Sequence, residues 1–171
     1  ASVEYIISAE TDTTMTLDIN VGAGWWRYEL ERVVPPAIAG DWKISPVAGA
    51  LAVGDAQGAA NWWTAGDAVV TERACFYDDI YRFNEDGTFE NVQGDQTWLE
   101  DFQSGAAAGC GAPVAPHDGS NAATYTHDDA AGTLTIDGLG AYIGLSKAIN
   151  GEEISNSNDA AASIVYTISA M

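Results

Sequence analysis

The stretch Tyr77–Val92, YDDIYRFNEDGTFENV, predicts a β-hairpin and with it the class of the fold. Aromatic and branched residues stand on both sides of Asp86-Gly87, and an Asp-Gly pair supplies the positive φ angles that tight hairpin turns need. The same succession of a short strand, a turn of Gly, Asp or Asn residues and another short strand recurs along the chain. The sequence is therefore typical of an all-β protein.

Three further strands are predicted before the first prolines, as a meander over residues 2–9, 15–21 and 25–33. In the second of them apolar and polar residues alternate, which is typical of a strand with one buried face. Pro35-Pro36 cannot continue a central strand, so residues 34–37 are predicted as a linker or corner.

The body of the chain, residues 38–171, holds short strand patterns separated by loops. Besides the hairpin, strands are predicted at residues 40–44, 68–76, 96–102, 124–127, 133–137 and 163–170. The Gly- and Ala-rich stretch 45–64 is predicted as a long loop with at most a short helical turn, and 103–123 as a surface loop. Roughly nine to ten strands in sequence-adjacent pairs favour one antiparallel up-and-down β-barrel, with a two-sheet β-sandwich as the alternative.

Composition limits the possible partners. The 171 residues suffice for a single domain with its own core. The 25 acidic and 6 basic residues give a net charge of −19, which disfavours nucleic acid and anionic membranes, because both need clustered Lys and Arg. No apolar run approaches the ~18 residues of a transmembrane helix. The acidic residues form either a solvated surface or a site for Ca²⁺ or a cationic partner.

Metal-binding patterns are weak. Asp128-Asp129 and residues 84–87 carry oxygen ligands but lack the twelve-residue D-x-D-x-D-G loop, so turn formation explains them better than Ca²⁺. His117 and His127 lack the spacing of a zinc site and are predicted as solvated loop residues. We predict no metal and no cofactor, and keep Ca²⁺ as the alternative.

Cys75 and Cys110 are the only cysteines. An isolated pair in an acidic, Gly- and Asn-rich chain suits an oxidising compartment, and a bridge would stabilise the fold by roughly 3–4 kcal/mol. Two buried free thiols are the alternative. The chain starts at Ala1 without a signal-peptide pattern, so we expect it to be processed or cut from a longer polypeptide.

The two ends of the chain repeat each other. Residues 1–9 are ASVEYIISA and residues 162–170 are ASIVYTISA, with six of nine positions identical. Chance is one explanation, and a tandem array with a period near 161 residues is the other. In an array, residues 1–33 would supply the closing strands of the barrel in permuted order. The two similar strands would compete for one place, which invites a strand-exchanged homodimer.

Three stretches resemble lipocalin-like domains. GDWK at 40–43 is similar to their opening G-x-W strand, YRFNEDGTF at 81–89 to their mid-chain hairpin, and WRYELER at 26–32 to their closing strand. The resemblance implies a calycin-type barrel in which Arg32 packs across Trp42 at the closed end. Here the closing strand precedes the opening one, which departs from the family order and favours a circular permutation.

A longer resemblance covers nearly all of residues 38–170. It rests on GDWKISPVAGALAVGDAQGAANWW, RACFYDD, YRFNEDGTFENV, CGAPVAPHDGSNAATY and GLGAYIGLSKAINGEEISN. These stretches are similar to domains appended to secreted polysaccharide-degrading enzymes of marine bacteria, such as laminarinase-like family 16 glycoside hydrolases. The resemblance implies a secreted or cell-surface accessory domain within a longer multidomain polypeptide. It transfers no catalytic residue and does not specify a ligand.

Tryptophan is the best guide to a binding surface. The chain has 6, of which Trp25-Trp26 and Trp62-Trp63 are adjacent pairs, so one member of each pair must face outward or into a loop. Sugar rings stack on flat aromatic side chains, while neighbouring carboxylates and amides bind their hydroxyl groups. The predicted ligand-binding residues are Trp62, Trp63, Trp98, Asp78, Glu100 and Asp101. Core packing of the tryptophans is the competing explanation.

An enzyme is the less favoured interpretation. Retaining glycosidases need two carboxyl groups about 5 Å apart, and the E-x-D-x-x-E strand pattern of family 16 enzymes is absent from the sequence. Asp78-Asp79 and Glu100-Asp101 are adjacent pairs whose side chains would point to opposite faces of a strand. The sequence also lacks a Gly-rich phosphate loop, a G-x-S-x-G elbow and an H-E-x-x-H motif.

We therefore expect a non-catalytic, extracellular module that binds glycan and accompanies polysaccharide degradation. Three alternatives stay open. They are a lipocalin-like carrier of a small apolar ligand, a structural spacer in a tandem array, and a weak glycoside hydrolase that acts through Asp78, Asp79 or Glu100.

Overall fold

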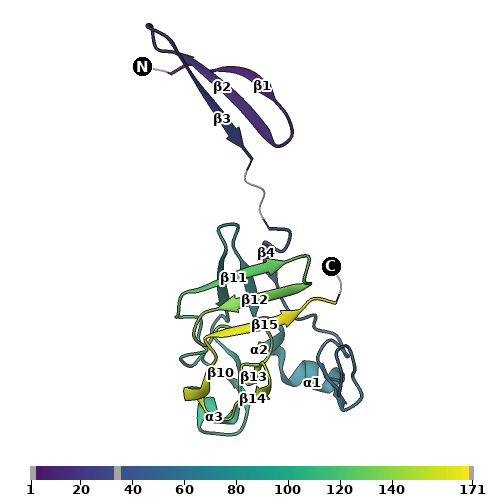
Figure 1. Ribbon diagram of the computed structural model, residues 1–171. Coiled ribbons are helices and arrows are strands. Elements are labelled where there is room, and N and C mark those ends of the chain that lie inside the picture. Colours follow the sequence, from purple (N-terminus) through teal and green to yellow (C-terminus); the bar gives the residue numbers. More distant parts are fainter. Residues whose placement is uncertain (1–2, 33–35, 170–171) are drawn as a thin grey trace. The chain divides into compact units, whose positions relative to one another are not determined.

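The computed structural model describes residues 3–32 and 36–169 (Figure 1). The chain divides into two compact units, residues 1–35 and 36–171, and each is described by itself. Strands hold 37% of the residues and helices 10%, and the strands form antiparallel sheets. The all-β class predicted from the sequence is confirmed.

The first unit is the predicted three-stranded meander. Strands β1 (Ile6–Glu10), β2 (Thr14–Asn20) and β3 (Trp25–Glu31) pair in the order β1-β2-β3. The register of β2 against β3 is regular along its whole length, whereas β1 shifts against β2 between Ile7 and Ala9. These strands pair among themselves, and their predicted role as closing strands for residues 38–171 stays a prediction.

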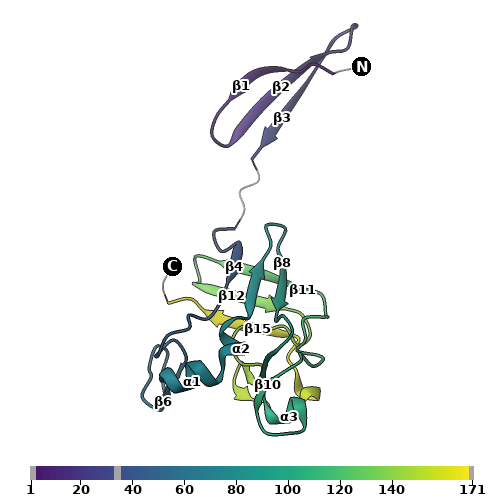
Figure 2. The same cartoon turned by 180° about the vertical axis from the view of Figure 1, so that it is seen from behind.

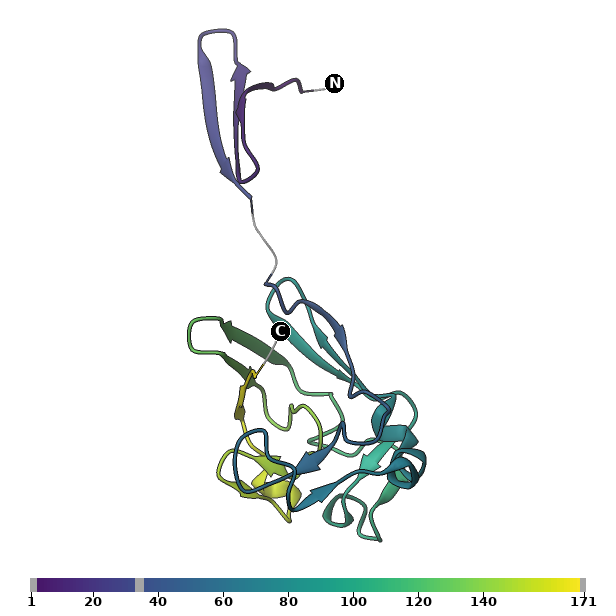
Figure 3. The same cartoon turned by 90° about the vertical axis from the view of Figure 1, so that its right-hand side faces the viewer.

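A six-stranded sheet forms the body of the second unit, in the order β15-β12-β11-β8-β7-β4. Its strands are β4 (Gly40–Trp42), β7 (Ile80–Phe83), β8 (Thr88–Val92), β11 (Ala123–Asp128), β12 (Thr133–Asp137) and β15 (Ser163–Thr167). Figure 3 shows β11 and β12 on one side of the unit and β7, β8 and β4 on the other, inclined toward each other. Within the described residues β4 and β15 are unpaired edges, so closure into a barrel is not confirmed.

Both predicted hairpins are confirmed. Gly87 makes the turn between β7 and β8 with a φ of +86°, and the Asp86 carboxylate accepts a hydrogen bond from the Thr88 N–H at 3.0 Å. The second hairpin, β11–β12, follows the predicted strands at 124–127 and 133–137. Turn chemistry is local, which is why the sequence alone places these hairpins.

Short elements gather at one end of this unit (Figure 2). They are β5 (Ala52–Val53), β6 (Trp63–Thr64), α1 (Asp67–Glu72), α2 (Ala74–Tyr77), β9 (Thr97–Leu99), α3 (Asp101–Ser104), β10 (Gly109–Gly111), β13 (Ala148–Ile149), β14 (Glu152–Glu153) and a 3₁₀ turn, Ser157–Asp159. The strand predicted at 68–76 is wrong, because this stretch forms α1 and α2. Its apolar residues occur in two runs, 68–70 and 74–76, rather than alternately, and such runs fit a buried helix as well as a strand. The strand predicted at 96–102 is only β9, and α3 follows it.

The main core lies on one face of the six-stranded sheet. Phe83 of β7 packs against Phe89 of β8 and Tyr125 of β11, with ring centres 5.1 and 5.0 Å apart. A loop covers this face: the Gly144 N–H donates to the Tyr81 hydroxyl at 3.0 Å, and the neighbouring Ile143 N–H donates to the Tyr166 hydroxyl at 2.8 Å. A second cluster joins α2 to β9 through Cys75, Phe76, Tyr77 and Trp98.

Candidate functional site

Arg73 joins two of the predicted ligand-binding tryptophans. Its guanidinium carbon lies 4.3 Å from the ring centre of Trp98 and 5.8 Å from that of Trp63. Both distances are within the range of cation–π attraction. The Arg73 Nε is buried and has no hydrogen-bond partner in the described part of the chain. The aromatic rings are therefore important contacts for this cation, and we call Trp63, Arg73 and Trp98 the stacked triad.

Three separate elements hold the stacked triad. Trp63 belongs to β6, which pairs with β5, and Trp98 is the central residue of β9. Arg73 stands between α1 and α2, and its carbonyl oxygen accepts the Phe76 N–H at 2.8 Å. The triad thus depends on tertiary packing, since Trp98 is 25 positions beyond Arg73 and belongs to a different ribbon of strands from Trp63.

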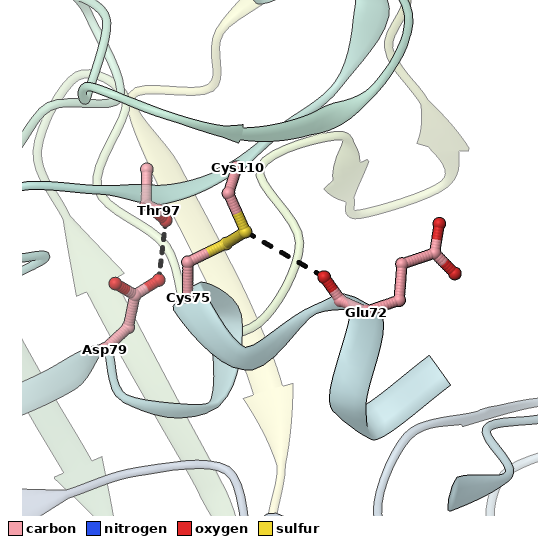
Figure 4. Close-up of a disulfide and its surroundings, with 5 residues drawn as sticks. All are labelled: Glu72, Cys75, Asp79, Thr97 and Cys110. Atoms are coloured by element: carbon pink, nitrogen blue, oxygen red, sulfur yellow. Dashed lines mark hydrogen bonds between the residues drawn. A yellow bond between two sulfur atoms is a disulfide. The ribbon is translucent and has the colours of Figure 1, made fainter. Parts of the chain in front are cut away.

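A disulfide fixes the position of Arg73 against Trp98. Cys75 of α2 and Cys110 of β10 are bonded, with their Cα atoms 6.0 Å apart (Figure 4). Cys110 is the cross-strand partner of Trp98, so their side chains share one face of the β9–β10 ribbon. The predicted disulfide is confirmed, and it ties the helix that follows Arg73 to β10, the strand that pairs with the one carrying Trp98.

The tryptophans of the site differ in access to solvent. Trp62 is 68% exposed and Trp63 is 39% exposed, whereas Trp98 is only 7% exposed. A ligand can therefore reach the side chains of Trp62 and Trp63, while the buried Trp98 ring packs against the Arg73 guanidinium. Trp98 packs in the second core cluster, and its predicted contact with a ligand stays a prediction.

The three predicted acidic residues do not converge. Asp78 lines an open groove of about 550 Å³. Glu100 is partly buried, with its carboxylate 3.9 Å from the Lys147 ammonium, and Asp101 accepts the Phe102 N–H at 2.7 Å at the start of α3. Glu100 and Asp101 therefore have local structural partners, and Asp78 alone lines the groove.

The groove contains polar residues that sequence reasoning missed. Gln93, Asp95 and Gln96 line it together with the disulfide. The Gln93 amide nitrogen donates to the Tyr142 hydroxyl at 2.8 Å, and its amide oxygen is buried without a partner among the described residues. The sequence holds no signal for this set beyond the turn-forming Gly94-Asp95, because β8, β9 and α2 come together only in the folded chain.

Asp79 lies in the interior and has an unusual proton affinity. It is 2% exposed, and one of its carboxylate oxygens accepts the Thr97 hydroxyl at 2.6 Å. Burial raises the pKa of Asp79 to about 7, because a charged carboxylate is poorly solvated there. A polymer cannot reach this buried group in the observed structure, so the raised pKa alone does not make it a general acid.

Neither histidine is a solvated loop residue, so that prediction is wrong. His117 is 2% exposed and packs edge-on against Tyr142, with ring centres 5.9 Å apart. Burial lowers the pKa of His117. The His127 side chain is also buried, with Nε2 3.2 Å from an Asp129 carboxylate oxygen. Over residues 3–32 and 36–169 no three His, Cys, Asp or Glu residues cluster as a metal site would require.

The predicted pair of Arg32 and Trp42 is described in separate units. Arg32 follows β3 in the first unit and donates to the Asp12 carbonyl at 3.3 Å. Trp42 belongs to β4 of the second unit, and its indole N–H donates to the Ile38 carbonyl at 2.9 Å. Packing of Arg32 across Trp42 stays a prediction.

Comparison with known proteins identifies no relative. No protein family, curated protein or solved structure matches this chain. Among the described residues, no helix is both long enough and apolar enough to cross a membrane.

Proposed function

We propose that this chain is a non-catalytic extracellular module that binds a neutral glycan. The observation that carries the proposal is the exposed Trp62 beside Trp63, which is held by the stacked triad and thus indirectly by the disulfide. A rigid aromatic surface is what a sugar ring needs, because its C–H face packs flat against the aromatic ring. Little conformational freedom is lost on binding when the rings are already fixed.

The groove supports the choice of a hydroxyl-rich ligand. Asp78, Asp95 and Gln96 present carboxylate and amide groups that can bind sugar hydroxyls. The groove and the stacked triad are neighbours in the fold, since Cys75 and Cys110 line the groove and Cys110 stands opposite Trp98. One glycan chain could therefore use the aromatic rings for stacking and the groove for hydrogen bonds.

Net charge selects among glycans. With a net charge of −19, the protein repels sulfated and carboxylated polysaccharides over a Debye length of about 8 Å at physiological salt. Asp78 and Asp95 place two of these negative charges in the groove itself. A neutral α- or β-glucan is therefore the better ligand class.

The core face of the six-stranded sheet does not favour the alternative of a carrier for an apolar ligand. The loop that contains Ile143 and Gly144 covers the core face and is held there by two tyrosine hydroxyls. A pocket beside this core, lined by Phe89 and Ala141, has a volume of only about 10 Å³, which is the size of a single water site. We therefore place the ligand on the surface.

Tryptophan fluorescence and calorimetric titration test the proposal. The panel contains a soluble β-glucan, a soluble α-glucan, a sulfated polysaccharide and a fatty acid. We expect saturable binding of one neutral glucan, at least about tenfold weaker in Trp62→Ala, which corresponds to about 1.4 kcal/mol. Trp25→Ala, which removes an exposed tryptophan of the first unit, is the matched control and should bind normally.

Three outcomes would refute the proposal. Binding of the fatty acid alone would favour the carrier, and silence across the panel would favour the spacer. Hydrolysis of a glucan that is lost in Asp78→Asn would favour the weak hydrolase.

A further inference from the structure

The β1–β3 unit presents an apolar face that residues 3–32 do not cover. Its register places Met15 opposite Leu30, Leu17 opposite Tyr28 and Ile19 opposite Trp26. Ile7 of β1 stands opposite Leu17 on the same face. None of residues 3–32 is buried. A three-stranded sheet needs a covered hydrophobic face to be stable in water, so this face indicates a missing partner.

The repeated sequence indicates what kind of surface would cover this face. Aligning residues 1–9 with 162–170 pairs Tyr5 with Tyr166 and Ile7 with Ile168. Tyr166 and Ile168 pack against the main core of the second unit, whereas Tyr5 and Ile7 are exposed. The same residue types are thus partly buried against a core in one unit and exposed in the other.

The edge strand β15 has a free side suited to one more strand. On that side the Asn150 side chain binds the backbone of Val165, donating at 2.8 Å and accepting at 2.7 Å. The Ile168 N–H points the other way and donates to Gly132, next to β12. Because backbone groups alternate along a strand, Thr167 presents its N–H and carbonyl to the free side.

In the first unit, the side of β1 that corresponds to the free side of β15 is paired with β2. The pairing of β1 with β2 starts at Ile6, opposite Asp18. Ile6 is the counterpart of Thr167 in the repeated sequence. The β2 pairing therefore begins at the position where the Asn150 contact on β15 has ended. A strand equivalent to β2 would fit beside β15 without displacing Asn150.

We propose that the β2–β3 hairpin of a second copy of this chain adds to the free edge of β15. Thr167 then lies opposite Asp18 and Ile168 opposite Leu17, and the apolar face of the hairpin extends the core of the six-stranded sheet. β15 takes the place that β1 holds in the donor. This inference is independent of the proposed glycan binding.

A second copy of this chain is the partner that fits both the hairpin and the edge. Each chain carries one hairpin to donate and one edge to receive it, so two copies can exchange hairpins and close a dimer. Exchange replaces β1 by the closely similar β15, so little pairing energy is lost.

Site-specific cross-linking tests the register. Full-length chains with Asp18→Cys are mixed with chains with Thr167→Cys, oxidised, and analysed by non-reducing electrophoresis and peptide mass spectrometry. Both positions are on the polar face, so the apolar contacts remain. We expect a cross-linked dimer of the two variants. Thr14→Cys, on the same face of β2 but four residues from Asp18, is the matched control and should not cross-link to Thr167→Cys.

The cross-linking has two results that would overturn the proposal. A second experiment uses one chain that carries both Asp18→Cys and Thr167→Cys. If this chain forms an internal disulfide and the mixed single-cysteine chains form none, the hairpin closes the sheet of its own chain. Absence of a bond in both experiments would exclude the register itself.

Light scattering gives a second measurement that does not depend on cysteines. We expect the wild-type mass to approach that of a dimer as concentration rises. Leu17→Asp, on the apolar face, should weaken association at least about tenfold, because it places a charge in the new interface. Thr16→Asp, on the opposite face of the same strand, should change it less than about twofold. A monomer at all concentrations, or equal effects of both variants, would refute the exchange.

Discussion

Removal of the Cys75–Cys110 bond should destabilise the second unit strongly. The two cysteines are 35 residues apart, and the loop-entropy relation gives about 13 cal/mol/K for a loop of that length, or about 4 kcal/mol at 25 °C. Cys75 also packs in the cluster with Phe76 and Trp98, so local contacts depend on the bond as well. For a domain of this size, 4 kcal/mol corresponds to a melting temperature lower by about 10–20 °C.

The assay compares the wild type with Cys75→Ala/Cys110→Ala in urea and thermal unfolding. Near-ultraviolet circular dichroism and tryptophan fluorescence follow the transition with and without a reducing agent. The reducing agent should lower the stability of the wild type and leave the double variant unchanged. A loss below about 1 kcal/mol, or an equal effect of reducing agent on both proteins, would show that the bond does not constrain the unfolded chain as reasoned.

The same variant also tests the mechanical link to the candidate site. Without the bond, α2 is no longer tied to β10, and Arg73 loses its fixed position over Trp98. We expect the tryptophan emission to shift to longer wavelength and the affinity for glycan to fall. Unchanged emission and affinity in a folded double variant would mean that packing alone holds the stacked triad.

Three further predictions follow from buried groups. Burial raises the pKa of Asp79 to about 7 from about 3.9 in the unfolded chain, so the stability from its protonated form is complete below about pH 4 and is lost as the pH rises through 7. The free energy of unfolding of Asp79→Asn, measured in urea titrations, should therefore rise relative to that of the wild type by up to about 4 kcal/mol between pH 4 and pH 8. If the difference between the two proteins stays constant over this pH range, the raised pKa of Asp79 is refuted. Arg73→Gln should cost about 1–2 kcal/mol in thermal unfolding by removing two cation–π contacts, and an unchanged melting temperature would exclude them. Ile136 is 0% exposed, so Ile136→Ala should lower the free energy of unfolding by about 2–5 kcal/mol. Val165 is exposed, so Val165→Ala should change the free energy of unfolding by less than about 0.5 kcal/mol.

Local patterns predicted most of the strands and failed at the helices. Asp86-Gly87 and the alternation along 15–21 depend on residues within a few positions of each other, and both were confirmed. Residues 68–76 were misassigned because their runs of consecutive apolar residues fit a buried strand as well as a helix packed on β9. That choice is made by the disulfide and the second core cluster, which involve residues far away in the chain.

Exposure of the tryptophans shows the same division. The sequence predicted that one of Trp62 and Trp63 faces outward, and both are exposed to different extents. It had no means to separate Trp98 from them, because only the approach of α2 brings Arg73 over the Trp98 ring. The groove was missed for the same reason, since Asp78, which follows α2, meets Gln93 and Gln96 of the β8–β9 loop only in the folded chain.

The sequence by itself determined the all-β class, the two hairpins and the N-terminal meander. These features follow from turn residues and from a period of two, whereas the cysteine pair left both a bond and two free thiols open. Tertiary structure decided which tryptophans a ligand can reach, where Asp79 acquires its raised pKa, and which sheet edges and faces are left unpartnered. The physical reason is that burial and desolvation depend on neighbours from distant parts of the chain, which no local pattern specifies.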